Sequence, residues 1–181
     1  MTKTFGCDQR ISKSSAIAEA LGSVDEINSL LGVIKMKGGE HSAILGLSWH
    51  VLLTETQHDL FIVQAELAGA EKKMDNAHVE KLSGWVNAIE KELPPITSFF
   101  ISGGTELGAL CDVARTVSRR AERRVVEAVR GDSLALRDVS PENLNDYKHL
   151  LAYMNRLSSF LYALARLANH RAGVKEEKPH Y

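Results

Sequence analysis

Apolar residues recur every three or four positions over most of this chain, which is the spacing of one face of an α-helix. From Val79 to Leu93, for example, the apolar positions alternate between spacings of three and four residues. Between residues 42 and 70 the apolar positions form two stripes, a pattern typical of a helix buried on more than one side. The pattern predicts five helices, over residues 23–38, 42–70, 77–93, 105–130 and 140–173.

The predicted helices are bounded by residues that commonly start or end helices. Ser23-Val-Asp-Glu26 has the form of a capping box, and Ser140-Pro141 places an N-cap before a proline at the first helical position. Gly38-Gly39 and Pro94-Pro95 are expected to end the helices that precede them. Because the links are short and no second domain is indicated, residues 1–181 are expected to form one all-α, five-helix bundle with ferritin-like, up-and-down packing.

The composition fits a single globular domain with a sizeable core. Of the 181 residues, 44% are hydrophobic and 25% are charged, and the formal net charge is −1. The lack of an overall positive charge argues against a general nucleic-acid binder. Two cysteines, Cys7 and Cys111, are too few for a disulfide scaffold, and no run reaches the roughly 18 apolar residues of a membrane span. We therefore expect a cytoplasmic protein with neither nucleic-acid nor membrane partners.

A dense arginine cluster lies in the predicted helix over residues 105–130. Residues 115–124 read Arg-Thr-Val-Ser-Arg-Arg-Ala-Glu-Arg-Arg, which is five arginines in ten positions. At roughly 100° per residue, the side turned away from the apolar stripe gathers five charged residues: Asp112, Arg115, Arg119, Glu122 and Arg123. A guanidinium donates a planar fork of hydrogen bonds that suits phosphate oxygens. Charge runs on helices are more often solvated rows of paired side chains, so residue type alone does not establish a phosphate site.

Five segments match, in order and at compatible spacing, the motifs of one known family. Two of them are specific, namely the arginine motif Ala114–Arg124 and Tyr153-Met-Asn-Arg-Leu-Ser158. Three others would be weak alone: Gly22–Ser29, Gln57–Phe61 and the Phe99–Gly104 turn. Together they span nearly the whole chain, which resembles the PduO-type ATP:cob(I)alamin adenosyltransferases.

The resemblance implies the reaction, the substrates and the assembly. In this family the Co(I) of reduced cobalamin attacks the 5′ carbon of ATP, so that the 5′-deoxyadenosyl group moves to cobalt and triphosphate leaves. Adenosylcobalamin is the product. Family members form homotrimers with active sites between neighbouring subunits, and Mg²⁺ is expected to accompany the triphosphate. A reductase or a cobalamin-dependent acceptor enzyme would be a further partner.

Site residues carry over from the family position by position. On the ATP side the resemblance implies Thr2, Lys3, Thr4, Lys13, Arg119, Arg120, Ala121, Glu122, Arg123 and Asn155. Arg119 and its neighbours through Arg123 would hold the phosphates and the nucleotide. Glu122 could hold an arginine in place or help to position the metal or the nucleotide, and the sequence leaves this choice open.

On the corrinoid side, Phe99 matches an aromatic residue that occupies the lower face of the corrinoid in the family. There it excludes ligand and water and leaves a four-coordinate cobalt that is easier to reduce. Asp25 and Arg115 match a salt bridge near the corrinoid, and together with Arg119 and Phe99 they are the expected catalytic residues. Without the resemblance, Phe99 would be interpreted as core, Asp25 as complementing a helix dipole and Asn155 as a solvated helix-flank residue.

The N-terminal segment departs from the family pattern. The family continues from Thr-Lys-Thr-Gly-Asp through a glycine-rich loop to Phe-Gly, whereas Thr2-Lys3-Thr4 here passes directly to Phe5-Gly6. The chain is therefore about eight residues shorter in a loop whose backbone N–H groups would bind phosphate. Either the protein lacks this loop and binds ATP weakly, or its natural chain carries a further glycine-rich segment at this point. The matching flanks favour the second explanation.

Two other function classes also have sequence features in their favour. Glu55-Thr-Gln-His58 and Asp146-Tyr-Lys-His149 imitate the Glu-x-x-His pairs of di-iron helical bundles, although His149 falls nearly opposite the apolar stripe of its helix. Alternatively, the arginine face could bind an acidic partner or nucleic acid in an interaction protein without transferase activity. Cys111 lies on a helix flank with no histidine at an informative spacing, so no nucleophilic role is assigned to it.

Overall fold

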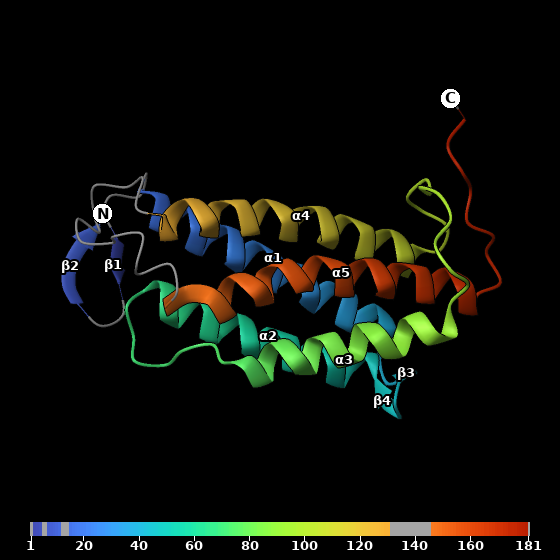
Figure 1. The fold of residues 1–181 in the computed structure, drawn as a ribbon, viewed down its shortest axis with the longest axis horizontal. Coiled ribbons are helices and arrows are strands. Elements are labelled where there is room, and N and C mark those ends of the chain that lie inside the picture. The colour runs from blue at the N-terminus through green and yellow to red at the C-terminus, as the bar shows by residue number, and fades with distance from the viewer. Residues whose placement is uncertain (1, 5–6, 12–14, 131–145, 181) are drawn as a thin grey trace.

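Five α-helices lie side by side in a bundle (Figure 1). The computed structural model describes residues 2–4, 7–11, 15–130 and 146–180. Within these residues the helices are α1 (Ala16–Gly38), α2 (Trp49–Leu67), α3 (Asn76–Glu92), α4 (Glu106–Val129) and α5 (Lys148–Arg171). Successive helices run in opposite directions, which confirms the up-and-down bundle expected from the sequence.

Two short β-hairpins correct the all-α prediction. β1 (Thr2–Thr4) pairs antiparallel with β2 (Cys7–Ile11), and β3 (Ser42–Ile44) pairs antiparallel with β4 (Leu47–Ser48). The helix that was predicted from residue 42 therefore begins only at Trp49. The fold is a helical bundle with the β1–β2 hairpin at one end and the β3–β4 hairpin on its side, below α3 in Figure 1.

The chemistry of a two-residue turn explains why residues 42–48 are not helical. Leu45 and Gly46 adopt positive φ angles of 51° and 76°, as the central residues of tight hairpin turns commonly do. Ser48 then acts as the N-cap of α2, because its hydroxyl accepts a hydrogen bond from the Val51 N–H at 3.2 Å. Gly46 is the residue in the sequence that favours this turn. The apolar residues around it fit a helical pattern, so the turn was not predicted.

The start of α1 also differs from the prediction. Ser15 is the N-cap, and its hydroxyl accepts a hydrogen bond from the Ala18 N–H at 3.2 Å. The proposed capping box at Ser23–Glu26 lies inside the helix, so that prediction was wrong. Ile17 and Ala20 are buried and extend the apolar stripe upstream, which is why the helix continues past a plausible cap.

The remaining helix ends agree more closely with the sequence. α3 and α4 begin and end within one residue of the predicted bounds. Gly39 follows α1 with a φ of 55°, as expected for a glycine that ends a helix. The cap predicted at Ser140-Pro141 lies outside the described residues.

α5 lies at the centre of the bundle and supplies much of its core. It packs against α3 and α4, while α1 packs against α2 and α4. Its largest fully buried side chains are Leu150, Tyr153, Met154 and Phe160. The predicted apolar stripe of α4 is confirmed from Ala114 to Ala128, which fixes the opposite side of that helix as the one available to a ligand.

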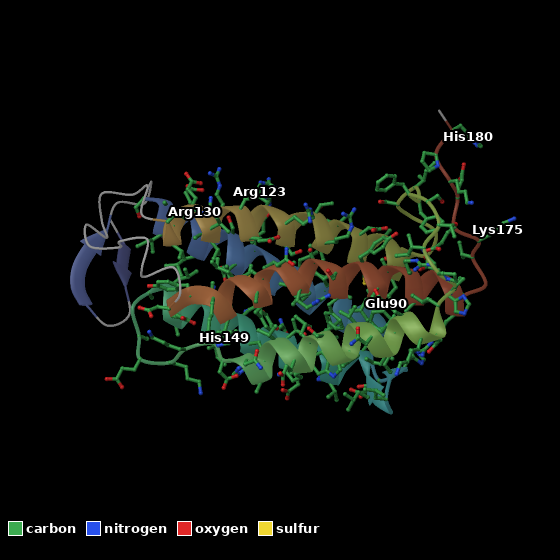
Figure 2. The ribbon with its side chains drawn as sticks, viewed as in Figure 1. Glu90, Arg123, Arg130, His149, Lys175 and His180 are labelled. Carbon is green, nitrogen blue, oxygen red and sulfur yellow. The ribbon has the colours of Figure 1, made fainter. Side chains whose placement is uncertain are left out.

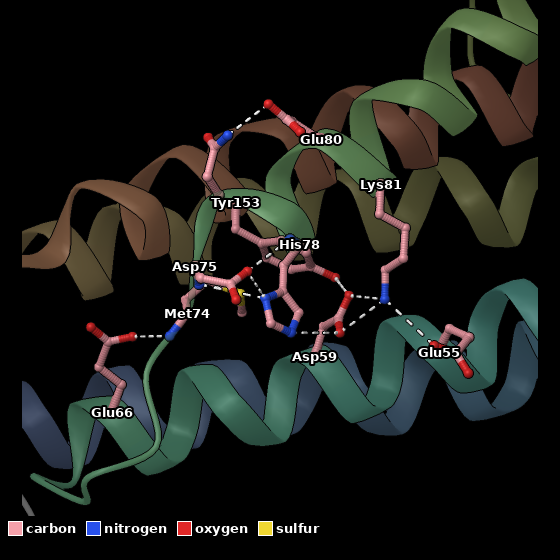
Figure 3. A network of polar contacts seen from close by, with 10 residues as sticks. Glu55, Asp59, Glu66, Met74, Asp75, His78, Glu80, Lys81 and Tyr153 are labelled. Atoms are coloured by element: carbon pink, nitrogen blue, oxygen red, sulfur yellow. Dashed lines mark hydrogen bonds and ion pairs between the residues drawn. The ribbon is translucent and has the colours of Figure 1, made fainter.

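A buried polar network joins α2, α3 and α5 (Figure 3). Asp59 on α2 is almost fully buried and accepts hydrogen bonds from the Tyr153 hydroxyl at 3.1 Å and from Lys81 Nζ at 2.9 Å. His78 Nε2 lies 3.8 Å from the same carboxylate. Burial, with Asp59 next to it, raises the pKa of Tyr153 well above its ordinary value, so the phenol stays protonated and donates. These contacts fix three helices relative to one another.

Candidate substrate site

A cavity of about 750 Å³ opens at one end of the bundle. It lies between α4, α5, the loop of residues 94–104 and the C-terminal tail of residues 173–180. Residues that border it include Phe99, Arg115, Arg119, Tyr162, Arg166 and Glu176. Its volume is in the range of small-molecule and cofactor sites, and it combines aromatic walls with fixed cations.

Phe99 borders this cavity and is not part of the core. Its side chain is 80% exposed, although the neighbouring Phe100 is only partly exposed. An aromatic ring left this open has no packing role within a single chain, so the interpretation of Phe99 as a core residue is wrong. Such a ring is available to cover a flat apolar ligand.

Arg115 enters the same cavity from α4 but does not pair with Asp25 in the chain. Its Nε donates to Asp112 Oδ1 at 3.4 Å, and its guanidinium lies 5.9 Å from the centre of the Tyr162 ring. Asp112, which the helix pattern placed on the solvent side, is buried against this contact. Asp25 is exposed on α1, and among the described residues no ion pair joins it to Arg115.

The arginines of the cluster differ in the groups that their guanidinium groups contact. Arg120 pairs with Glu26 of α1, and Arg124 pairs with Glu127 one turn along at 3.1 Å. Arg123 Nη1 donates to the Arg119 carbonyl at 3.2 Å. Within the part of the chain that the structure describes, the Arg119 guanidinium has no such partner and is exposed beside the cavity. It is therefore the arginine best placed to bind an external anion.

Glu122 contacts α5 and holds none of the neighbouring arginines among the described contacts. Its Oε1 accepts a hydrogen bond from Asn155 Nδ2 at 2.9 Å, so it holds an amide and not an arginine. This contact brings the arginine motif of α4 and the Asn-Arg-Leu-Ser motif of α5 together. By contrast, the side chain of Ala121 is fully buried in the core and presents no surface to a ligand.

The N-terminal candidates lie at the other end of the bundle. Thr2, Lys3 and Thr4 form β1, next to the point where α4 ends and α5 begins (Figure 1). Figure 2 shows Arg123 and Arg130 along the part of α4 that leads toward this hairpin. Lys13 lies outside the described residues. The predicted ATP residues of α4 thus lie between the cavity and β1, and Asn155 of α5 lies beside them.

The geometry does not support the di-iron alternative. Glu55 and His58 are exposed on α2, and Glu55 contacts Lys81 at 3.5 Å. Asp146 is exposed just before α5. Across the described ranges no group of three or more histidine, cysteine or acidic side chains converges as a metal site requires.

The described part of the chain also includes no helix long and apolar enough to cross a membrane.

Cys111 is equally unsuited to nucleophilic chemistry. It is fully buried, and burial raises the pKa of its thiol far above the ordinary range. The thiol is therefore protonated at physiological pH, and a protonated thiol is a poor nucleophile. No role for Cys111 was expected from the sequence, and its position in the core is consistent with a packing function.

With the geometry in place, comparison with known proteins identifies the family. A family model described as cobalamin adenosyltransferase matches residues 1–168. The chain belongs to this family. A corrinoid adenosyltransferase from Bacillus subtilis is 30% identical over 169 residues, which cover 91% of this chain and 80% of that protein. A cobalamin adenosyltransferase from Cupriavidus metallidurans is 32% identical over 173 residues, which cover 95% of this chain and 85% of that protein.

Solved structures of adenosyltransferases share the fold. A variant of the PduO-type ATP:corrinoid adenosyltransferase from Lactobacillus reuteri, complexed with cobalamin and ATP, superposes with a TM-score of 0.80 and 27% identity. The match covers 99% of this chain and 94% of that one. A second variant of the same enzyme, complexed with ATP, gives a TM-score of 0.78 at 28% identity. The PduO-type resemblance found in the sequence is confirmed.

Several cavity residues of this adenosyltransferase were not predicted from the sequence. Tyr162, Arg166 and Asn169 line the cavity from α5, and Glu176 lines it from the tail. Arg166 is only 5% exposed, which is unusual for an arginine and indicates a specific partner. A signal was present, because Arg166 and Asn169 interrupt an otherwise apolar stretch of a helix three positions apart.

Proposed function

We propose that this protein transfers the 5′-deoxyadenosyl group of ATP to the cobalt of a reduced corrinoid. The Co(I) electron pair forms a cobalt–carbon bond to C5′, and the bond from C5′ to the triphosphate oxygen breaks. Cobalt is formally oxidised from Co(I) to Co(III), and triphosphate leaves with the electron pair of the broken bond. With cobalamin as the acceptor, the product is adenosylcobalamin.

The observation that carries this proposal is the juxtaposition of Phe99 and Arg119 at one cavity. An exposed aromatic ring and an arginine without a carboxylate partner among the described residues border the same space. A corrinoid offers a broad, largely apolar face, and triphosphate offers several anionic oxygens. These two ligand chemistries fit the two kinds of residue.

On the nucleotide side, Arg119 and Arg123 hold the triphosphate and stabilise the charge that develops as it leaves. Glu122 fixes the Asn155 amide, whose remaining hydrogen-bonding groups are free to face the nucleotide. Arg120 supports the row through its ion pair with Glu26, which ties α4 to α1. Thr2–Thr4 and Lys13 are further phosphate ligands in this proposal, and β1 lies at the end of the bundle toward which α4 runs.

Magnesium fits this arrangement because it needs few protein ligands. Mg²⁺ commonly keeps phosphate oxygens and waters as ligands and takes only one or two carboxylates. Glu122 supplies a carboxylate within the arginine motif, and only its Oε1 is engaged by Asn155. When bound, the ion would neutralise part of the triphosphate charge, while the arginines orient the leaving group.

On the corrinoid side, Phe99 covers the lower face of the ring and excludes water and axial ligand from the cobalt. Arg115 is held by Asp112 and Tyr162 at the wall of the cavity. Because Asp25 does not reach Arg115 among the described ion pairs of one chain, we assign that salt bridge to Asp25 of a neighbouring copy. The site is then completed between subunits.

A homotrimer is the assembly that agrees with this site. α1 and α4 run antiparallel and are joined by ion pairs from Lys37 to Glu106 and from Glu26 to Arg120. Large apolar side chains stay exposed on these two helices, at Val33, Met36 and Val113. A neighbouring subunit would cover them. We place the enzyme in the cytoplasm, where a reductase supplies the electron and an acceptor enzyme receives the product.

One experiment tests the activity directly. The purified protein is incubated with ATP, Mg²⁺ and chemically reduced cobalamin, and product is followed through the light-sensitive spectrum of adenosylcobalamin. We expect product that depends on ATP and is accompanied by equimolar triphosphate. Absence of both products from folded protein would overturn the proposal. Salt-sensitive binding of nucleic acid without turnover would instead support an interaction protein.

A further inference from the structure

Both ends of the loop that carries Phe99 are held by one face of α5. Arg166 Nη2 donates to the Pro94 carbonyl at 3.0 Å, at the start of the loop. Asn169 Nδ2 donates to the Gly103 carbonyl at 2.8 Å, at its end. Arg166 and Asn169 are 5% and 8% exposed, so these contacts form in a protected environment where hydrogen bonds are directional and strong.

Three hydrogen bonds hold the Asn169 side chain in place. Its Oδ1 accepts from the N–H and from the hydroxyl of Thr105, each at 2.9 Å, while its Nδ2 binds Gly103. Thr105 is the N-cap of α4. Asn169 therefore couples the end of the Phe99 loop to the start of the helix that carries the arginines.

The C-terminal tail closes the same arrangement from outside. Glu176 receives a two-pronged contact from Arg166, with Nε to Oε1 at 2.7 Å and Nη2 to Oε2 at 3.0 Å. The Ile101 N–H donates to the Glu177 carbonyl at 2.8 Å. The Arg166 guanidinium also lies 5.4 Å from the centre of the Phe100 ring. The residues on the C-terminal side of Phe99 are thus tied to the tail and to α5.

Phe99 itself has almost no packing of its own, since 80% of its side chain is exposed. The direction of its ring therefore depends on the backbone that carries it. We propose that Arg166, Asn169 and Glu176 are positioning residues that hold Phe99 against the lower face of the corrinoid. This inference rests on the proposed placement of the corrinoid in this cavity, and it adds the tail to the machinery of the reaction.

The Arg166–Glu176 pair suits this role better than a general stabilising one. Exposed ion pairs contribute little, but the two side chains here are only 5% and 19% exposed and meet in a bidentate geometry. A buried pair of this kind fixes orientation more than it adds stability. Loss of Glu176 should therefore loosen the loop without unfolding the bundle, whose core lies elsewhere.

The first test compares Glu176→Ala with Glu177→Ala. Both remove one negative charge from the tail, but Glu177 binds Ile101 through its backbone carbonyl, which survives the substitution. We expect Glu176→Ala to slow adenosylation of Co(II) cobalamin in the presence of a reductant by about fivefold or more, with a smaller effect on pre-reduced Co(I). The Kd of ATP should stay close to wild type, whereas the Tm should fall because the buried Arg166 loses its carboxylate partner. Glu177→Ala should behave as wild type throughout.

A second variant addresses the opposite end of the loop. Asn169→Asp keeps an acceptor for Thr105 but loses the donor to the Gly103 carbonyl. We expect the same selective loss with Co(II), and a weaker spectroscopic signature of four-coordinate Co(II) in the ternary complex with ATP. Equal losses with Co(I) and Co(II) in both variants would mean that these residues have only a structural role and would overturn the inference.

A double-mutant cycle with Phe99→Ala shows whether the effect passes through Phe99. If Glu176 acts by positioning that ring, adding Glu176→Ala to Phe99→Ala costs little more, whereas independent roles give multiplied losses. Multiplied losses would overturn the inference. If Phe99→Ala alone leaves Co(II) adenosylation unchanged, the proposed placement of the corrinoid fails. If Phe99→Ala slows it and both Glu176→Ala and Asn169→Asp do not, only the positioning role fails.

Discussion

Neighbouring arginines of one helix have different roles because they have different partners. Arg120 forms an ion pair with Glu26, and Arg124 forms one with Glu127. Arg119 faces the cavity with no carboxylate partner among the described residues. Sequence spacing placed all of them on the same helix and could not distinguish a paired arginine from an available one. For Arg120 the distinction depends on Glu26 of α1, whereas the partner of Arg124 is Glu127 on α4 itself, three residues along.

Replacement of Arg119 should therefore remove activity without removing the fold. We expect Arg119→Ala to lower kcat/KM for ATP by about 100-fold or more, because a cation that stabilises the leaving triphosphate acts in the transition state. Arg124→Ala is the matched control, since it removes the same group from a site already neutralised by Glu127. Steady-state kinetics and circular dichroism of both variants make the comparison. Wild-type kinetics in folded Arg119→Ala would contradict the assignment.

Glu66 gives a second residue-level prediction, concerning pH and stability. It is buried at the end of α2 and accepts a hydrogen bond from the Met74 N–H at 2.7 Å, and burial raises its pKa. Because the folded pKa lies above the unfolded one, the stabilising effect of the proton is complete at acidic pH and is lost as pH rises through the folded value. Ionised Glu66 therefore costs stability near neutral pH.

Glu66→Gln should raise the Tm at pH 7 by on the order of a few °C, since an amide oxygen still accepts from Met74 without carrying charge. The gain should disappear near pH 4, where the wild-type carboxyl is already protonated. Thermal unfolding at both pH values measures this, with the exposed Glu71→Gln as a control that should show no such gain. A destabilised Glu66→Gln at pH 7 would show that the charge itself is favourable.

Two glycines near the start of α4 leave room for the Asn169 side chain of α5. A Cβ at Gly108 would lie 2.4 Å from Asn169 Oδ1 and 2.9 Å from Thr105 Oγ1, and a Cβ at Gly104 would lie 2.7 Å from Asn169 Oδ1. Gly104 also has a φ of 98°, which other residues rarely adopt. The Asn169 amide therefore fills the space where the loop joins α4. The contacts around it leave this amide no room to shift.

Gly108→Ala should consequently destabilise the protein by about 1–3 kcal/mol, because the added methyl group overpacks a fixed contact. Gly84→Ala is the control, since Gly84 is also helical and its Cβ would meet nothing within 4 Å. There the usual helix preference for alanine should add about 0.5–1 kcal/mol of stability. Denaturant unfolding of the two variants gives the opposite signs directly, and equal signs would contradict this account.

Helix periodicity was sufficient for some elements and insufficient for others. α3 and α4 have a single apolar stripe and clear ends, so their bounds followed from the sequence. The 42–48 hairpin and the start of α1 did not, because local turn and cap chemistry at Gly46 and Ser15 competed with a continuous apolar pattern. Phe99 and Arg119 were found through motifs. The contact from Arg166 to Glu176 joins a buried helix position to the tail, and residue spacing carries no information on such a pairing.

For the whole molecule, the exposed apolar residues on α1 and α4 agree with the proposed assembly of several chains. Met36 is 77% exposed and Val113 is 51% exposed, on helices whose other faces are buried. Apolar patches of this kind commonly mark interfaces between subunits. The same two helices carry Asp25 and Arg115, so burial of the patch and completion of the site are expected to occur together.

We therefore expect a homotrimer, with a mass three times that of the single chain, which is 19.9 kDa for the 181 residues. Light scattering at micromolar concentration measures this. Met36→Glu should weaken assembly and lower activity in parallel, because it places a charge in the covered patch. Lys72→Glu, at an exposed position in the α2–α3 connection, is the control and should leave both unchanged. An active monomer would exclude a site shared between subunits.

The hairpin of β1 and the tail lie at opposite ends of the bundle (Figure 1). Fusions to the two ends of the protein are therefore not equivalent. A purification tag or reporter domain joined after the tail would crowd the cavity proposed for the corrinoid, whereas one joined before β1 would crowd the proposed approach of the nucleotide. A flexible glycine- and serine-rich linker moves an attached domain away in proportion to the square root of its length, so short linkers offer little relief. If the corrinoid and the nucleotide bind as proposed, the position of the tag determines which of the two substrates a tagged form binds less well.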